Sequence, residues 1–209
     1  MSDGQIPIFD GVYNDPSAST TLVSSDEVYF RVDPYILKKG STVLRDMLFD
    51  PNLTPSSIPL DLPSDELRTL LSFLDFGKPT EPTSIAGWKR LLEMGDKFDC
   101  QGLRMRIREH AELKAFDKPW ETFCLASHLN DEKLAKHSLK LMVEDVNASM
   151  IRLEDMPASL AQQASMHYLL GLFKALMQQM HWSTGFCKML TTDDPVRWHD
   201  VAEAFYPSY

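Results

Sequence analysis

Cysteine and histidine are the residue types of this chain that can bind a metal ion or take part in nucleophilic catalysis. Cys124 and His128 lie four residues apart, and His181 and Cys187 follow further along the chain. Four such ligands can hold a zinc ion, but structural zinc sites usually rely on close C-x-x-C pairs, and the sequence has none. We therefore expect no metal site, and we interpret Cys124 as an inert core thiol and His128 as a surface residue.

The chain also lacks the sequence motifs of common enzyme chemistries. It contains no G-x-S-x-G, P-loop, G-x-G-x-x-G or H-E-x-x-H pattern. No set of residues supplies a recognisable acid, base and nucleophile. The sequence therefore predicts no catalytic residue and no cofactor, and an enzyme is the least favoured class of function.

Two further groups of residues suggest binding but have a simpler interpretation. Met166, Met177 and Met180 lie in one expected helix and resemble the adaptable methionine surfaces that accept varied partners. Such a stripe is more often part of a core, and we favour that interpretation. The arginines between residues 104 and 108 are spread around an expected helix, which indicates a solvated face rather than a phosphate site.

Charge and composition restrict the classes of partner. The 209 residues carry a net charge of −9 without a local basic patch, so direct binding of nucleic acid is disfavoured. Three cysteines, an odd number outside any spaced framework, indicate reduced thiols. The start MSDGQIPIFD lacks the features of a secretory signal, and the most apolar window, MHYLLGLFKALMQQM, contains Lys174 and is too short for a bilayer. We expect a cytoplasmic or nuclear protein that does not bind a membrane.

The first part of the chain is predicted to change from strands to helices. Residues 1–19 are rich in Ser, Asp, Gly and Pro and are expected to be mostly irregular. The segment TTLVSSDEVYFRV alternates around a turn and predicts a β-hairpin. A helix is expected to begin at Pro34 and to end at Gly40, after which Ser41 caps a second helix that runs to about Phe49.

One further strand and a series of helices are expected after this corner. Residues 58–62 alternate as in a short edge strand, the kind of strand in which Pro59 is tolerated. Capping residues and helical spacing predict a long helix over 158–180 and a short last helix from Asp194. A small sheet capped by a cluster of helices is an α+β fold. The other expected helices begin near residues 64, 84, 103, 120 and 132.

Four segments in this order carry a resemblance to a known family. They are VYFRV, YILKKGSTVLRDMLF, IPLDLPSDELRTLLSFLDFG and LLEMGDKFDCQGLRMRI, and they resemble successive elements of BTB/POZ domains, in particular those of fungal proteins. The segment KPWETFCLASHLNDEKLAKHSLKLM is similar to the helices that follow the domain in that group. We expect a BTB/POZ-like domain over 20–115, preceded by the irregular segment 1–19 and followed by an all-helical extension over 116–209.

The resemblance implies a non-catalytic interaction module that pairs with itself or recruits a protein partner. Family members commonly pair through the hairpin and the first helix, and Tyr29, Tyr35 and Ile36 lie in these elements of the chain. Large apolar or aromatic side chains at such a corner are expected to be covered, either by a partner or by residues 1–19. The chain departs from the family at Asp33, where members usually have a histidine near the dimer axis.

An alternative function is substrate adaptation for a cullin-family ubiquitin ligase. Adaptors of the BTB family often have a hydrophobic residue followed two positions later by an acid after the second helix. Leu53 is followed at that spacing by a proline, whereas Leu48, Phe49 and Asp50 have the right types at the expected helix end. No separate substrate-binding domain is recognisable. The candidate interaction surface comprises Tyr29, Tyr35, Ile36, Leu48, Phe49 and Leu53.

Overall fold

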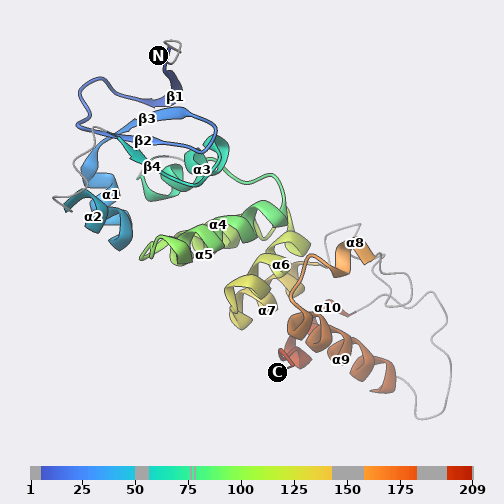
Figure 1. The fold of residues 1–209 in the computed structure, drawn as a ribbon. Helices are drawn as coiled ribbons and strands as arrows, with labels where there is room; N and C mark the ends of the chain where they lie inside the picture. Colours follow the sequence, from blue (N-terminus) through green and yellow to red (C-terminus); the bar gives the residue numbers. More distant parts are fainter. Residues whose placement is uncertain are drawn as a thin grey trace. The chain divides into compact units, whose positions relative to one another are not determined.

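The chain forms two structural units. The computed structural model describes residues 6–49, 57–75, 77, 79–142, 158–182 and 197–208 (Figure 1). Unit 1 comprises Met1–Arg106 and unit 2 comprises Ile107–Tyr209. The division between them falls inside helix α5 (Leu103–Lys114).

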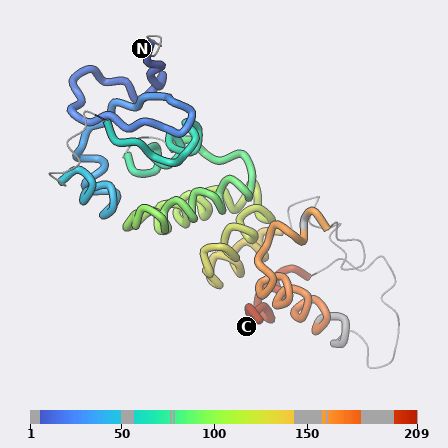
Figure 2. Tube along the Cα trace, viewed as in Figure 1, coloured from blue at the N-terminus to red at the C-terminus, as the bar shows by residue number. Residues whose placement is uncertain are grey.

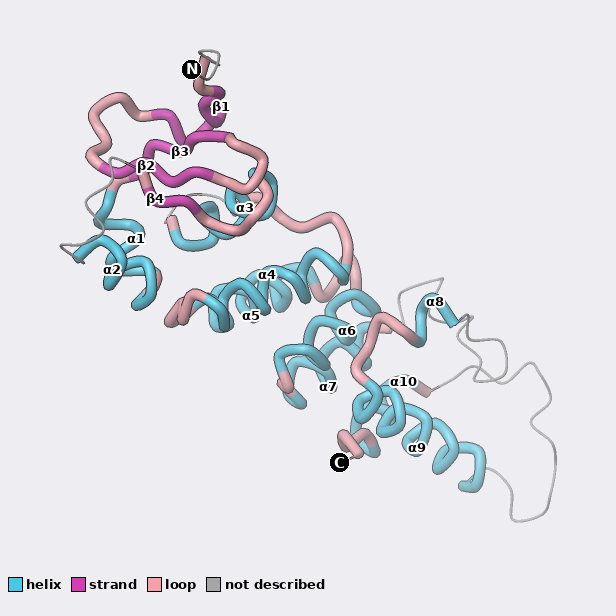
Figure 3. The backbone as a smooth tube through the Cα atoms, viewed as in Figure 1, coloured by secondary structure: helices cyan, strands magenta, loops and turns pink. Residues whose placement is uncertain are grey.

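A four-stranded mixed sheet forms one part of unit 1 (Figure 3). The expected hairpin is confirmed, because β2 and β3 pair in antiparallel fashion with Leu22 opposite Phe30. β1 adds to β3 and β4 adds to β2, both in parallel, which gives the order β1-β3-β2-β4 and places Pro59 on an edge strand as expected. Together with its helices, the sheet confirms an α+β fold. The strands are β1 (Ile8–Asn14), β2 (Thr20–Val23), β3 (Val28–Val32) and β4 (Ile58–Pro59).

Strand β1 corrects the expectation that residues 1–19 are mostly irregular. Within β1 the usual alternation is broken, because the pairing with β3 shifts register between Phe9 and Asn14: Ile8 and Val12 are exposed, whereas Asp10 between them is buried. A strand is recognised in a sequence by apolar residues that face the core, and here the inward-facing residue is an aspartate. The strand exists because its backbone pairs with β3 and because Asp10 finds polar partners inside the unit.

Two short helices, α1 (Pro34–Gly40) and α2 (Thr42–Phe49), form the expected corner after β3. The Tyr35 amide donates to Asp33 Oδ1 at 2.8 Å, and the Leu44 amide donates to Ser41 Oγ at 3.0 Å, so both helices are capped as predicted. Gly40 is required by a close approach, since a Cβ there would lie 2.9 Å from Leu74 Cδ2. It is not a left-handed cap, because its φ is not positive.

Helices α3 (Ser64–Leu74) and α4 (Ile85–Lys97) complete the core of unit 1. Both begin as expected, and Ser84 Oγ accepts the Gly87 amide at the start of α4. The ring of Phe73 on α3 meets Trp88 on α4 edge to face, with 5.6 Å between the ring centroids. The inward faces of the two helices are apolar and comprise Leu67, Leu70, Leu71, Trp88, Leu91 and Leu92.

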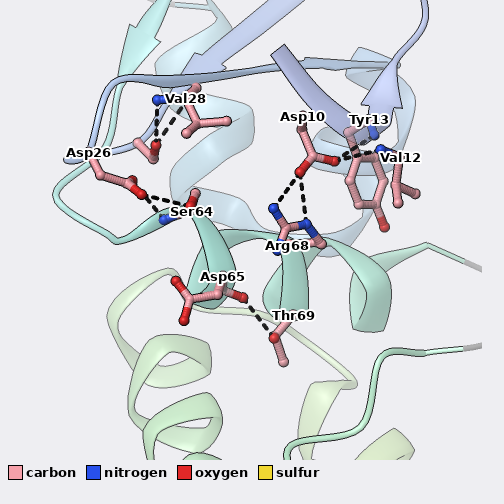
Figure 4. Close-up of polar contacts among 10 residues, drawn as sticks. Asp10, Val12, Tyr13, Asp26, Val28, Ser64, Asp65, Arg68 and Thr69 are labelled. Carbon is pink, nitrogen blue, oxygen red and sulfur yellow. Dashed lines mark hydrogen bonds and ion pairs between the residues drawn. The ribbon is translucent and has the colours of Figure 1, made fainter. Parts of the chain in front are cut away.

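A buried ion pair joins β1 to α3 (Figure 4). The Asp10 side chain is fully buried, and its Oδ2 accepts from the Arg68 guanidinium at 2.7 Å. Its Oδ1 accepts the amides of Val12 and Tyr13 at 2.9 and 2.8 Å. Burial raises the pKa of the Asp10 carboxyl, but the two amides and Arg68 outweigh it and hold the pKa below its usual value. Charge-assisted bonds therefore fix the register of β1 on unit 1.

A second polar contact joins the hairpin turn to the start of α3 (Figure 4). Pro63 precedes α3 and makes no side-chain cap. Instead, Asp26 Oδ1 accepts the Ser64 amide at 2.8 Å, and Asp26 Oδ2 accepts the Ser64 hydroxyl at 2.7 Å. An acidic residue from the hairpin turn thus serves as the cap of a helix 38 residues further along the chain.

The arginines between 104 and 108 do not simply form the expected solvated face. In unit 1, Arg106 donates to the carbonyls of Phe73 and Asp75 and so satisfies the last turn of α3. In unit 2, Arg108 Nε lies 2.6 Å from Asp131 Oδ2. Helical spacing could not predict these bonds, because the acceptors lie 23 to 33 residues away in the sequence.

Unit 2 is helical in its described residues. The predicted pair α6 (Pro119–Leu129) and α7 (Glu132–Leu141) is confirmed, with Asn130 in the left-handed region at φ 55° between them. Helix α10 (Trp198–Ala204) packs against α7 and against α9 (Met166–Trp182), as Figure 2 shows within this unit. Arg197 precedes α10 and is not helical, so the last helix does not begin at residue 194, which itself lies outside the described residues.

The single long helix expected over 158–180 is wrong. The structure has α8 (Ala158–Ala161), then a break, then α9. At the break, Ser165 donates its amide to Ser127 Oγ at 2.9 Å and its hydroxyl to the Ser127 carbonyl at 3.3 Å. These bonds to α6 replace helical ones, and nothing in the local spacing reveals them.

Aromatic rings fill the core of unit 2. Phe123 lies 5.4 Å from Trp120, 6.3 Å from Tyr168 and 5.7 Å from Phe205, measured between ring centroids. The chain after α10 passes so close to α9 that a Cβ at Gly171 would lie 2.2 Å from the Tyr206 carbonyl oxygen. A glycine is therefore needed in the middle of α9 because a backbone approaches there.

Candidate interaction surface

Two aromatic side chains stand in solvent at the corner of α1 and α2. Tyr35 is 61 % exposed and Phe49 is 65 % exposed. The Lys38 ammonium lies 4.7 Å from the centre of the Phe49 ring, and the Lys39 ammonium lies 5.9 Å from that of Tyr35. Both distances fall within the range of cation–π attraction. We call Tyr35, Lys38, Lys39 and Phe49 the aromatic–basic surface.

The caps and the core of the corner explain why these four side chains face outward. Because Asp33 caps α1, Tyr35 lies in its first turn, and the two lysines lie in its last turn, where the helix dipole favours cations. The inward positions are taken by Leu37 and Leu44, which are buried. The surface is therefore held on a rigid corner whose inner face is fixed by packing.

The other sequence-predicted residues are less exposed. Ile36 and Leu48, on the same two helices, are half-buried. Tyr29 on β3 is also half-buried, and its ring lies 5.7 Å from that of Phe9 on β1. The N-terminal segment therefore covers part of Tyr29, which was one of the two expected explanations. Leu53 lies outside the described residues.

Sequence reasoning missed the two lysines of this surface. The available indication was their spacing, because Lys38 and Lys39 follow Tyr35 by three and four residues, the spacing of neighbours on a helix face. The contact of Lys38 with Phe49 joins two helices and has no such indication. The lysines matter because they place positive charge beside the two rings on a chain whose net charge is −9, while Asp33 and Asp46 of the same corner carry negative charge.

The two described cysteines are poorly suited to nucleophilic chemistry. Burial raises the pKa of the Cys100 thiol to about 11, against the opposing hydrogen bond of Ser41. Burial also raises the pKa of Cys124, which is completely buried on α6. A thiol reacts as the thiolate, so both groups are held in their unreactive form near neutral pH.

The zinc ligands considered from the sequence do not form a described cluster. The His128 Nε2 atom lies 2.8 Å from the Gln163 carbonyl oxygen, to which it donates its proton. Cys187 lies outside the described residues, and the His181 side chain is not described. Within the described part of the chain, no three His, Cys, Asp or Glu side chains come together as metal ligands would.

A shallow cavity of about 360 Å³ lies between α3 and α4 in unit 1. Asp65, Glu66, Ser84 and Arg90 contribute to its lining. The Arg90 guanidinium already binds the Glu66 carboxylate, with Nε 3.0 Å from Oε2. Arg90 and Glu66 are thus engaged with each other at an open surface, which favours a surface ion pair over a ligand site.

Comparisons with protein-family models and with curated proteins identify no relative of this chain. No protein-family model matches the chain, and no curated protein matches it. Among the described helices, none combines the length and the apolarity that crossing a bilayer requires.

Proposed function

We propose that the chain is a non-catalytic protein-interaction module of the BTB/POZ type. In this proposal, unit 1 recruits a protein partner, or a second copy of itself, through the aromatic–basic surface. The observation that carries the proposal is the exposure of Tyr35 and Phe49 at a rigid corner. The order of elements in unit 1 supports the family assignment, because hairpin, helix pair, strand and helix follow one another as the resemblance implies.

The chemistry of the surface suits a protein partner. Aromatic residues are enriched at the centres of interfaces, where their large area is removed from water. The lysine ammonium groups beside Tyr35 and Phe49 would favour carboxylates on the partner. A partner segment that combines apolar and acidic side chains therefore fits this surface best.

The buried thiols and engaged polar groups argue in the same direction. An enzyme needs reactive groups that meet in a site shielded from water. Cys100 and Cys124 are held as neutral thiols, and Asp10 and Arg68 are engaged with each other inside unit 1. These groups support the fold, which favours the exposed surface over them as the place where unit 1 acts.

The proposal is tested with the intact chain and the double variant Tyr35→Ala/Phe49→Ala. Light scattering gives the molar mass of each, and pull-downs from cell extract give the captured proteins. We expect the double variant to lose roughly 2 kcal/mol or more of binding free energy, the usual size of a hot-spot loss, and to keep its circular dichroism spectrum. Met105→Ala, an exposed apolar residue of unit 1, serves as the matched control.

Two outcomes would contradict the proposal. The first is a chain that neither self-associates nor captures any protein specifically. The second is a double variant that retains the wild-type partners with unchanged affinity. A cullin scaffold added as a separate bait tests the adaptor alternative, in which the half-buried Leu48 near the end of α2 is the hydrophobic residue of the motif and Asp50, outside the described residues, is the acid.

A further inference from the structure

Helix α9 in unit 2 carries an exposed apolar stripe. Met166 is 67 % exposed, Leu170 is 43 % exposed and Met177 is 54 % exposed, and Phe173 between them is half-buried. The four positions are separated by four, three and four residues, so they lie on one face of the helix. The expectation that the methionines of this helix belong to the core is therefore wrong for Met166 and Met177, and the side chain of Met180 is not described.

The opposite face of α9 already forms the core of unit 2. Tyr168, Leu172 and Ala175 are completely buried there. Helix α9 is thus apolar on two faces, and an α-helix with this pattern is usually buried on both. The stripe differs in this respect from isolated exposed apolar residues, which need no explanation.

The stripe is complementary to itself. Its spacing of four, three and four residues reads the same in both directions, with a methionine at each end and larger branched or aromatic side chains in the middle. Two copies placed antiparallel around a two-fold axis would bring Met166 against Met177 of the second copy. Leu170 would then meet Phe173 of the second copy. This is the spacing of a coiled-coil seam, with methionines that adapt their shape at both ends.

The charge of α9 permits such a pair. Lys174 is the only charged residue among its 17 residues, on a chain whose net charge is −9. In the antiparallel arrangement the two Lys174 side chains lie ~7 Å apart along the helix axis, given a rise of about 1.5 Å per residue. Solvent between exposed ammonium groups weakens their repulsion. Helix α9 itself therefore brings no carboxylate into opposition when two acidic chains approach through it.

We propose that the Met166–Met177 face of α9 is a homotypic docking surface, on which α9 of a second copy packs antiparallel. This surface lies in unit 2 and does not depend on the aromatic–basic surface of unit 1. A standard interface involves about 20–30 residues on each partner, far more than the four side chains of the stripe. We therefore expect a weak pair.

Charge substitution in the full chain tests the arrangement. Met166→Glu and Met177→Lys both change exposed side chains, so the fold should persist. Sedimentation of each variant alone, over a range of concentrations, should show self-association weakened by about tenfold, the effect of ~1.4 kcal/mol. Leu113→Glu, which adds the same charge at an exposed apolar position of unit 2, is the matched control and should leave self-association unchanged.

A mixture of the two variants gives the decisive measurement. In the antiparallel pair, Glu at 166 in one copy faces Lys at 177 in the other, and the second pair of contacts is restored to two methionines. Mixing should therefore recover the association that is weakened in each variant alone. Repeating the mixture in the Tyr35→Ala/Phe49→Ala background excludes a contribution from unit 1.

Three results would overturn the proposal. If the wild-type chain stays monomeric at every concentration, another occupant covers the face. If Met166→Glu associates as strongly as Leu113→Glu does, the stripe does not form the contact. If each variant is weakened but the mixture does not recover, two copies do not pack antiparallel on this face.

Discussion

Each of the two units is stabilised internally by a different kind of contact. In unit 1, directional polar bonds join elements that are distant in sequence, as between Asp10 and Arg68 or between Asp26 and Ser64. In unit 2, the central contacts are those of rings around Phe123. Hydrogen bonds and ion pairs fix how two elements are aligned, and their strength depends on the protonation of the groups involved. The stability of packed rings depends instead on how completely the side chains fill the core. We therefore expect the two units to be destabilised by different substitutions and conditions.

The largest effect is expected from removing volume in unit 2. Phe123→Ala deletes a buried ring with three aromatic neighbours and should destabilise unit 2 by about 3–5 kcal/mol. Hydrogen exchange of the intact chain, followed by mass spectrometry, reports protection for each helix separately. We expect α6 and α9 to lose protection while β2 and β3 keep theirs. Equal losses in both units would show that they do not respond independently.

A smaller effect is expected from removing the charge inside unit 1. Asp10→Ala breaks the contact with Arg68 and two amide bonds and should destabilise unit 1 by about 2–4 kcal/mol, less than for a fully buried pair because Arg68 is partly exposed. Denaturant titration measures the loss. Asp61→Ala, at an exposed aspartate of unit 1, is the control and should have little effect.

The same variant gives unit 1 a different pH dependence. The pKa of Asp10 is lowered in the folded chain, so its stabilising contribution is present above the ordinary value of 3.8 and is lost as the pH falls through the lower folded pKa. Wild-type unit 1 should therefore lose more stability on acidification than the Asp10→Ala variant. Parallel curves for the two proteins would contradict this role of the carboxylate.

The smallest effect is expected from a single methyl group at the contact between α9 and the chain end. Gly171→Ala places a Cβ against the Tyr206 carbonyl and should destabilise unit 2 by about 1–3 kcal/mol. Without a clash, replacing a helical glycine by alanine should stabilise the helix by about 1 kcal/mol. A loss of stability in this variant would therefore identify the clash with the Tyr206 carbonyl. Gly11→Ala, where no atom lies within 4 Å, should not lower the thermal unfolding temperature. Unfolding at the same temperature for both variants would contradict the close approach.

Local patterns predicted most elements of unit 1. The caps at Asp33, Ser41 and Ser84 act within four residues of the helices they start, so they are visible in the sequence. Strand β1 was not visible, because its inward residue is charged and its partner Arg68 lies 58 residues away. The break before α9 was missed for the same reason, since Ser165 bonds to Ser127 on another helix.

The candidate surface was predicted in part. Tyr35 was chosen as a large side chain near a corner and Phe49 as part of a motif at a helix end, and their exposure is what the structure adds. Lys38 and Lys39 were missed because the candidates were selected as apolar or aromatic side chains, which leaves out the cations beside them. On α9 the stripe itself was visible, but spacing alone does not tell which of two apolar faces is covered.

The bonds of Asp10 also affect how the sheet edge meets other molecules. β1 is an edge strand, and an edge with free amides can pair with a strand of a neighbouring chain and start aggregation. The amides of Val12 and Tyr13 are directed to the Asp10 carboxylate and are not free to donate to such a strand. At the other edge, Pro59 has no amide proton to donate. Both borders of the sheet thus discourage unwanted strand addition, one by a carboxylate and the other by an imino acid.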